Sequence, residues 1–280
     1  MSVPQIFDRT VRRRRRDRAA PLYPDHDFLR TAMLDGIAER LDAVTRDFTD
    51  ILDLGSFDGA FAPPPGARVA RVDAGYRFAR SSGGVQGDED RLPFADASFD
   101  CVVSVGVLDQ IGDLPGALAL ARRVLRPDGL FLAAFVGAGS FPVLRRVLGM
   151  AEQDRPVARL HPQVDVRSAG DLLVRAGFAL PVADIETLDI GYPDLFRLIG
   201  DLRGMAGTSI LADRHPLSRE AVARAVQAFA AAAGPDGRTR ERIEIVYCTG
   251  WSPDPSQPLP AKRGSGKASL AQALRPGGPA

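Results

Sequence analysis

The sequence has few of the residues that build disulfide scaffolds and metal centres. Its 280 residues include two cysteines, three histidines and one tryptophan. Cys101 and Cys248 both stand in apolar segments, which predicts small buried side chains in a reducing compartment. The spacing of His26, His161 and His215 does not support an iron site of two histidines and a carboxylate, so no metal is expected. His161, beside Pro162, is expected to be a loop histidine that caps a backbone group.

Long apolar runs and a strong net charge are missing as well. No apolar stretch is long enough for a membrane-spanning helix, and no signal-peptide core follows the first residues. The formal net charge is +1, so the chain as a whole has no electrostatic attraction to nucleic acid or to membranes. With 45% hydrophobic and 25% charged residues, the composition predicts a globular protein of the cytoplasm, with one large α/β domain or two small ones.

The pattern centres on a short apolar segment that runs into a glycine turn, Ile51-Leu52-Asp53-Leu54-Gly55-Ser56-Phe57-Asp58-Gly59. Such a segment is typical of a buried parallel strand, and ligands bind outside the carboxyl ends of these strands. Asp73 follows Asp53 by 20 residues and ends the next apolar run, where a nucleotide-binding fold has its ribose-hydroxyl acceptor. A structural turn after any buried strand would give a similar pattern, so both interpretations stay open.

Segments of strand and helix type alternate along most of the chain. Strands are expected at 51–54, 67–72, from 85, and at 101–105, 130–136, 185–190 and 242–249. Helices are expected at 28–48, 114–125, 141–150, 166–176, 194–205 and 219–233, and a tight turn at 126–129. Asp113 is the expected cap of the helix at 114–125. This alternation predicts an α/β fold with a doubly wound, Rossmann-like and mostly parallel sheet of about seven strands.

The first two crossovers between these strands are unusually short. Only seven residues lie between Gly59 and the second strand, and three of them are prolines. A parallel crossover ordinarily needs about a dozen residues, mostly helix. The prolines would stop a helix after about one turn, and the segment 75–84 after the second strand is short too. Truncated helices are therefore expected after the first two strands.

Five arginines in a row, Arg12 to Arg16, mark the first part of the chain. They favour an anionic partner, either an acidic protein face or acidic lipid headgroups, but a solvated amphipathic segment lying over the domain would have the same pattern. Asp8 and Asp17 argue against an import presequence, because such peptides are poor in acids. The sequence divides into a basic arm (1–27), a domain (28–252) with a helical insert at about 137–180, and a flexible Pro/Gly-rich basic tail (253–280).

Three later motifs form a specific series: Asp88-Glu89-Asp90-Arg91-Leu92-Pro93-Phe94, then Ala97-Ser98-Phe99-Asp100, then Arg122-Arg123-Val124-Leu125-Arg126-Pro127-Asp128-Gly129. In this order they resemble the class I S-adenosylmethionine-dependent methyltransferases. The resemblance implies S-adenosylmethionine as cofactor, with Asp73 on its ribose hydroxyls and Asp88 on its adenine amino group. Backbone groups of Gly55 and Glu89 would lie beside it, and Asp53 would support the turn. The candidate cofactor-binding residues are Asp53, Gly55, Gly59, Asp73, Asp88, Glu89 and Ser104, and no catalytic residue is assigned.

A narrower resemblance runs almost from end to end. It is carried by the short motifs at 6–9, 17–20, 175–178, 192–193, 201–205, 216–219, 249–251, 255–258 and 262–265. These motifs resemble a subgroup that contains the methyltransferase-like assembly factor of respiratory complex I and its bacterial relatives, with the malonyl-carrier-protein methyltransferase of biotin synthesis as a more distant cousin. The resemblance implies a protein substrate such as a complex I subunit, modified by methyl transfer or by arginine hydroxylation. It also allows a peripheral position at the inner face of the membrane.

The sequence departs from the family pattern at the expected pocket. Phe57 stands at the middle glycine of the family's turn, so its ring must point away from the ligand or fill the space of the methionine part. The truncated first helix removes free N–H groups near the ligand. Asp109 stands where related enzymes often have histidine, which removes a candidate acid–base group. A diverged, non-catalytic binding or assembly module with a degenerate pocket is therefore the alternative function.

Overall fold

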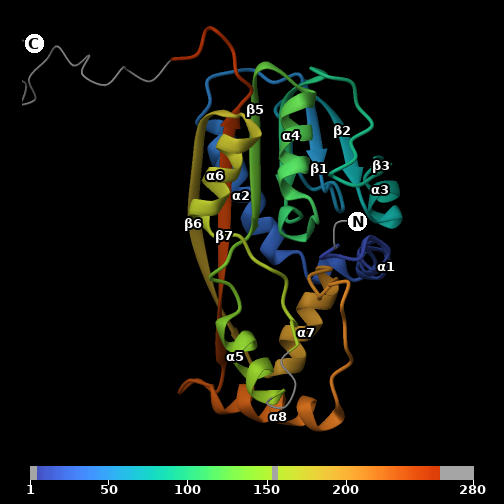
Figure 1. Ribbon diagram of the computed structural model, residues 1–280, viewed down its shortest axis with the longest axis vertical. Coiled ribbons are helices and arrows are strands. Elements are labelled where there is room, and N and C mark those ends of the chain that lie inside the picture. The colour runs from blue at the N-terminus through green and yellow to red at the C-terminus, as the bar shows by residue number, and fades with distance from the viewer. Residues whose placement is uncertain (1–4, 153–156, 259–280) are drawn as a thin grey trace, which may run out of the picture.

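The computed structural model describes residues 5–152 and 157–258. Its central sheet has seven strands in the order β3-β2-β1-β4-β5-β7-β6 (Figure 1). The strands are β1 (Asp50–Leu54), β2 (Arg68–Asp73), β3 (Val85–Gln86), β4 (Phe99–Val105), β5 (Leu125–Val136), β6 (Ala179–Tyr192) and β7 (Thr239–Trp251). The pairs from β3 to β5 are parallel, whereas β7 is antiparallel to β5 and to β6. The predicted Rossmann-like, mostly parallel sheet is confirmed.

Helices cover both faces of this sheet. The α-helices are α1 (Arg9–Ala19), α2 (Phe28–Asp42), α3 (Tyr76–Ser81), α4 (Leu114–Val124), α5 (Pro142–Ala151), α6 (Val166–Ala176), α7 (Leu195–Gly204) and α8 (Arg219–Ala231), and two 3-10 turns are η1 (Tyr23–Asp25) and η2 (Leu108–Gln110). Figure 1 shows α5, α7 and α8 together beyond one end of the sheet, and α1 at the end to which the arrows of β1 and β2 point.

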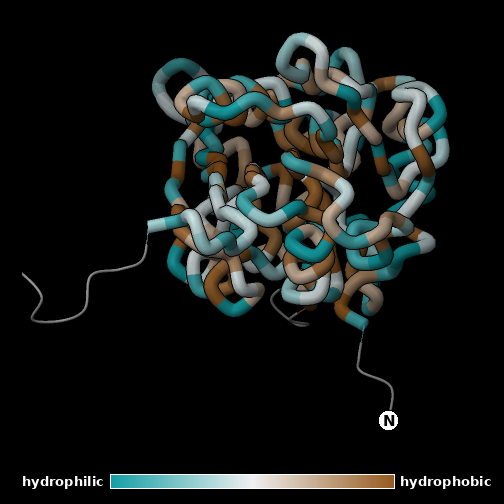
Figure 2. The backbone as a smooth tube through the Cα atoms, turned by 90° about the horizontal axis from the view of Figure 1, so that it is seen from above, coloured by the Kyte–Doolittle hydropathy of each residue, from teal (hydrophilic) through white to brown (hydrophobic). Residues whose placement is uncertain are grey.

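The two faces arise because successive strand side chains point to opposite sides. In β4, Val103 and Val105 belong to one buried apolar cluster and Val102 to the other. Residues of α2, α5, α7 and α8 join the first cluster, and residues of α4 and α6 join the second. Seen from above, hydrophobic segments gather in the middle of the molecule (Figure 2). No helix in the described part of the chain combines the length and the apolar character that crossing a membrane requires.

The local structure differs from the expected pattern at several places. The helical turn expected after β1 is absent, because residues 55–67, with their three prolines, form only turns and irregular structure. The helix after β2 is short, as predicted, with six residues in α3. The tight turn expected at 126–129 lies inside β5, where the pairing with β4 shifts register and Asp128 has a φ of 60°. The cap predicted for α4 is confirmed, since Asp113 accepts the Gly116 N–H at 2.9 Å.

Candidate functional site

Most of the predicted cofactor-binding residues lie at the carboxyl edge of the parallel strands. Asp53 stands in β1 with Gly55 and Gly59 in the turn after it, and Asp73 ends β2. Asp88 and Glu89 follow β3, and we call Asp73, Asp88, Glu89 and Asp90 the acidic edge. Ser104 is buried inside β4, and its hydroxyl has no hydrogen-bond partner among the described residues. Gly59 lies apart from the acidic edge, against Ser82 of the α3 cap.

Asp73 already has four donors on its carboxylate. The backbone N–H groups of Phe57 and Gly75 donate to it at 2.9 and 2.7 Å. Arg16 of α1 forms a two-point contact with the same carboxylate, through Nε at 2.8 Å and through Nη2. Two donors on each oxygen fill the lone pairs that a carboxylate offers. Arg16 is 0% exposed, so this ion pair is shielded from water.

The rest of the acidic edge is also bound by arginines of α1. Arg12 donates to both oxygens of Glu89 at 2.5 and 2.6 Å. Arg13 donates to Asp88 at 2.7 Å, and Arg9 contacts both Asp88 and Asp90. The four arginines follow one another at spacings of three, one and three positions, which places them on one side of a helix.

This arrangement corrects the prediction for the arginine run. We expected Arg12 to Arg16 to be solvated or to face an acidic partner outside the molecule. Arg12 and Arg16 are instead 5% and 0% exposed, and their partners are carboxylates of the same chain. Among the five, Arg13 and Arg14 are exposed and Arg15 is half-buried. The remaining basic tail, from residue 259 onwards, lies outside the described residues.

Phe57 fills space beside the acidic edge. Its ring stacks on Tyr23 at 5.0 Å and meets Phe78 edge-on at 5.2 Å. The guanidinium carbon of Arg16 lies 3.8 Å from the centre of the Phe57 ring. Phe57 belongs to a buried cluster with Tyr23 and Phe78. The backbone of Phe57 has a φ of 49°, a conformation that usually belongs to glycine. The side chain therefore occupies the place that the glycine pattern of the family leaves open.

The cofactor implied by the fold family does not fit the chain as it is folded. Asp73 has no acceptor left for ribose hydroxyls, because Arg16 and two backbone groups use all of them. The Gly55 N–H donates to the Val72 carbonyl at 2.8 Å and is not free either. The side chains of Asp88 and Glu89 hold arginines. Any step that involves the cofactor would first require α1 to leave the acidic edge.

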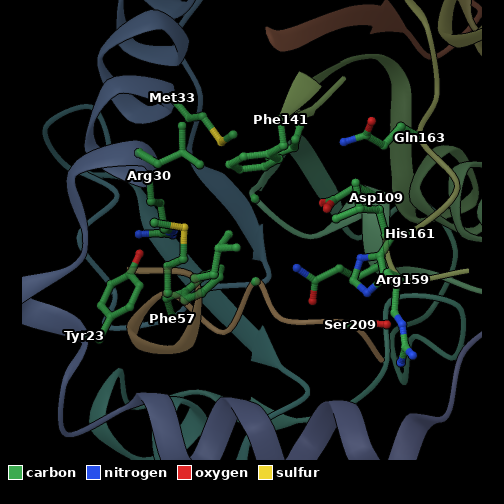
Figure 3. Close-up of a pocket in the computed structure, with 18 residues that line it drawn as sticks. Tyr23, Arg30, Met33, Phe57, Asp109, Phe141, Arg159, His161, Gln163 and Ser209 are labelled. Atoms are coloured by element: carbon green, nitrogen blue, oxygen red, sulfur yellow. The ribbon is translucent and has the colours of Figure 1, made fainter. Parts of the chain in front are cut away.

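A pocket lies next to Phe57, between α2 and the carboxyl ends of β4 and β5 (Figure 3). Its empty space is about 780 Å³ with the adjoining open solvent included, and the centres of water-sized groups can occupy about 80 Å³ of it. Met33, Phe57 and Phe141 supply apolar walls, whereas Arg30 and Asp109 bring charges to it from opposite sides. The lining therefore offers apolar contacts to the stem of a ligand and charged contacts to a polar head.

Asp109 is the acidic group of this pocket. Burial raises the pKa of its carboxyl to about 7. Its Oδ1 is buried and has no hydrogen-bond partner among the described residues. A carboxyl with this pKa can exchange a proton near neutral pH, so Asp109 is itself a candidate acid–base group in place of the histidine.

Two further charged groups line the site without full hydrogen bonding. Burial raises the pKa of Asp53 to about 6, against the opposing effect of Arg30 and Arg71, which lie 3.9 and 3.8 Å away. Arg30 donates to Asp58 at 3.3 Å, but its Nε and Nη2 have no hydrogen-bond partner in the described structure. Asp53 thus balances a buried arginine that the sequence patterns did not identify.

His161 has the structural role that its position beside a proline predicts. Its Nε2 accepts the backbone N–H of Ile210 at 2.9 Å. Burial lowers the pKa of His161 to about 4, so the ring is neutral at physiological pH. The histidine holds the segment after α7 against the pocket wall.

Known proteins share this architecture. The family model for a methyltransferase domain matches residues 52–133. The arginine-hydroxylase NDUFAF5 of Danio rerio is 33% identical, over 95% of this chain and 88% of that protein. A malonyl-[acyl-carrier protein] O-methyltransferase of Methylovorus sp. (strain MP688) is 28% identical, over 91% of this chain and 93% of that protein. Among solved structures, a SAM-dependent methyltransferase of Thermotoga maritima has a TM-score of 0.52 at 16% identity, covering 86% of this chain and 99% of that one.

Proposed function

Because the chain belongs to the family of the NDUFAF5 arginine-hydroxylases, we propose that it acts on an arginine side chain of a protein substrate in the assembly of respiratory complex I. The relatives of this name match the chain over most of its length, which supports a shared kind of substrate. Hydroxylation and methyl transfer are both compatible with the fold, and the mass of the modified arginine distinguishes them.

The observation that carries this proposal is the buried, unpartnered Oδ1 of Asp109, the acidic side chain in a pocket lined by apolar residues and by Arg30 and Arg159. A guanidinium group that enters the pocket would donate to this oxygen in a charge-assisted hydrogen bond. The aliphatic stem of the substrate arginine would pack between Met33, Phe57 and Phe141 and exclude water. Binding of the cation would favour the ionised carboxylate and so lower the pKa of Asp109 from its value of about 7.

We propose S-adenosylmethionine as the cofactor, in keeping with the methyltransferase-domain match. When bound, it supplies an activated methyl group. Asp73 would bind its ribose and Asp88 its adenine, beside the turn from Gly55 to Gly59 and the backbone of Glu89. These groups become available only when the arginines of α1 move away.

A second candidate is a non-catalytic assembly module that retains the fold and holds a partner. The specific observation in its favour is the complete use of Asp73 by Arg16 and backbone donors. In this role the exposed Arg14 would contact an acidic protein face or a membrane surface.

The test is capture of partners from the native cell, followed by mass spectrometry of the captured proteins. We expect a complex I subunit that carries a modified arginine with the wild type. Asp109→Asn should reduce the modified fraction at least about tenfold, the scale of losing one charge-assisted contact. Asp189→Asn, an exposed carboxylate on β6, is the matched control and should change nothing. Capture of the subunit without any modification would favour the module, and the absence of complex I proteins would contradict both candidates.

A further inference from the structure

We infer that α1 is the resident ligand of the acidic edge and that its arginines compete with S-adenosylmethionine for the same carboxylates. The competition presupposes the cofactor proposed above. The guanidinium groups of Arg16, Arg12 and Arg13 stand on Asp73, Glu89 and Asp88. These are the residues on which the family pattern predicts the ribose, the adenine and the adjoining backbone contacts.

The charges of the two elements match closely. Arg9, Arg12, Arg13 and Arg16 face four acids, and every one of these acids has at least one arginine within 3.2 Å. Without α1, four like charges would lie together at the ends of β2 and β3, which disfavours their ionised forms. The edge therefore needs cations in the absence of a bound ligand, and α1 supplies them.

The surrounding chain is shaped for a close approach of α1. A Cβ added to Gly75 would lie 2.8 Å from the Cβ of Arg16, so a larger residue there would push the helix away. Asp17 of α1 accepts the Arg77 N–H at 2.9 Å, at the beginning of α3. Arg16 also lies flat on Phe57 at 3.8 Å. The contacts of α1 with Gly75, with the Arg77 N–H and with the Phe57 ring therefore all form only when the helix lies on the acidic edge.

The start of α1 is fixed to a distant part of the chain. Phe7 forms an antiparallel bridge with Leu211, and the Asp8 N–H donates to the Ile210 carbonyl at 2.8 Å. Asp8 also caps α1 by accepting the Val11 N–H at 3.0 Å. The first turn of the helix is thus anchored by backbone hydrogen bonds that do not involve the acidic edge.

Competition reduces cofactor affinity by the fraction of molecules in which the edge is open. Two kinds of variant raise this fraction by different means. Arg12→Ala with Arg16→Ala removes the competing cations, and alanine preserves the helix. Gly75→Ala keeps every charge and displaces α1 by steric contact alone. The matched controls are Arg14→Ala, an exposed arginine of the same helix, and Gly200→Ala, a glycine of α7 with open space around it.

The experiment is calorimetric titration of the folded full chain with S-adenosylmethionine and with S-adenosylhomocysteine. We expect both opening variants to bind at least about tenfold more tightly than the wild type and the two controls, as for an edge that is open in a tenth of molecules or fewer. Asp73→Ala added to either opening variant should abolish the gain. Circular dichroism checks that each variant is folded.

Trypsin cleavage within residues 9–18 follows the position of α1 directly, with mass spectrometry to locate the cuts. The wild type should resist cleavage, and saturating S-adenosylhomocysteine should accelerate it. Equal affinity of wild type and opening variants, or cleavage that ligand does not change, would overturn the competition while the cofactor proposal stands. If no folded variant binds either ligand, the cofactor proposal itself is wrong and the competition falls with it.

Discussion

The two halves of the sheet are covered and stabilised by different kinds of contact. On one side, β1, β2 and β3 have 5, 6 and 2 residues, and their crossovers hold only the six-residue helix α3. On the other side, β5, β6 and β7 have 12, 14 and 13 residues and pack against full helices. The short half is completed by an arginine helix on buried carboxylates, and the long half by apolar burial.

The difference teaches where each half is vulnerable. Apolar burial depends on area and volume and changes little with salt or pH. Buried ion pairs gain little over an apolar contact, but breaking one leaves an uncompensated charge in a place without water. The arginine half should therefore fail abruptly when one partner is removed, whereas the apolar half should lose stability in proportion to the volume removed.

The largest effect is expected for Arg16→Ala. It leaves Asp73 buried without its counter-charge and with two of its four hydrogen bonds, which should lower the free energy of unfolding by about 3–5 kcal/mol. Urea denaturation measures this loss. Arg14→Ala on the same helix should cost less than about 0.5 kcal/mol. Adding Asp73→Ala to Arg16→Ala should recover part of the lost free energy of unfolding. If Arg16→Ala alone costs no more than Arg14→Ala, the contrast between the two halves is wrong.

In the apolar half, Leu132→Ala should lower the free energy of unfolding by about 3 kcal/mol. Leu132 is fully buried in β5 among apolar side chains, so the loss combines transfer energy with a cavity. The same value is expected at low and at high salt, because no charge is involved. A loss that varies strongly with ionic strength in the urea midpoint would show that the two halves are not independent.

Phe57→Gly tests whether the aromatic filling is structural. Removal of a buried ring costs about 3–5 kcal/mol, and relief of the positive φ returns about 1–2 kcal/mol, so a net loss of about 2 kcal/mol is expected. Thermal unfolding measures it. Leu180→Gly is the control, since Leu180 also has a positive φ but is 45% exposed. The control should be neutral or slightly stabilising, and a stabilised Phe57→Gly variant would mean that the ring is strained in its place.

The smallest effect is the pH dependence of Asp109→Asn. The folded pKa of Asp109 is raised to about 7 from 3.8, so wild-type stability is greatest below the unfolded pKa and falls as the pH rises through the folded one. The asparagine variant lacks this fall. We expect the free energy of unfolding of the variant to equal that of the wild type at about pH 4 and to exceed it by about 1–2 kcal/mol at about pH 8. Contact of the side chain with solvent reduces the full effect. Urea midpoints at both pH values decide it, and an advantage that shrinks with rising pH would contradict the burial of this carboxyl.

Local patterns predicted the architecture well. The strands, the helix from Val166 to Ala176, the cap at Asp113 and the loop role of His161 all depend on periodicity or on neighbouring residues. The ends of β6 were placed less well, because its exposed residues give no alternation that separates strand from loop. The fold class could therefore be predicted from short segments alone.

The binding of the α1 arginines to the acidic edge could not be predicted from such local patterns. Five consecutive arginines present charge on every side of a helix, so no periodicity marks the inward pair Arg12 and Arg16. Their partners are 57 to 77 positions away in the chain, and the same acids also fit a cofactor pattern. The one usable signal was Phe57, whose ring in a glycine turn had either to point away from the ligand or to fill the space of its methionine part.

The contacts of α1 also constrain the order of folding. Its partners lie up to 81 positions along the chain at Asp90, and the bridge of Phe7 extends to Leu211, so the place of α1 does not exist until most of the chain has been made and the sheet has formed. Although α1 precedes the sheet in the chain, it should therefore dock after the sheet has formed. Its contacts would be absent from the folding transition state, so weakening them should accelerate unfolding and leave the folding rate nearly unchanged.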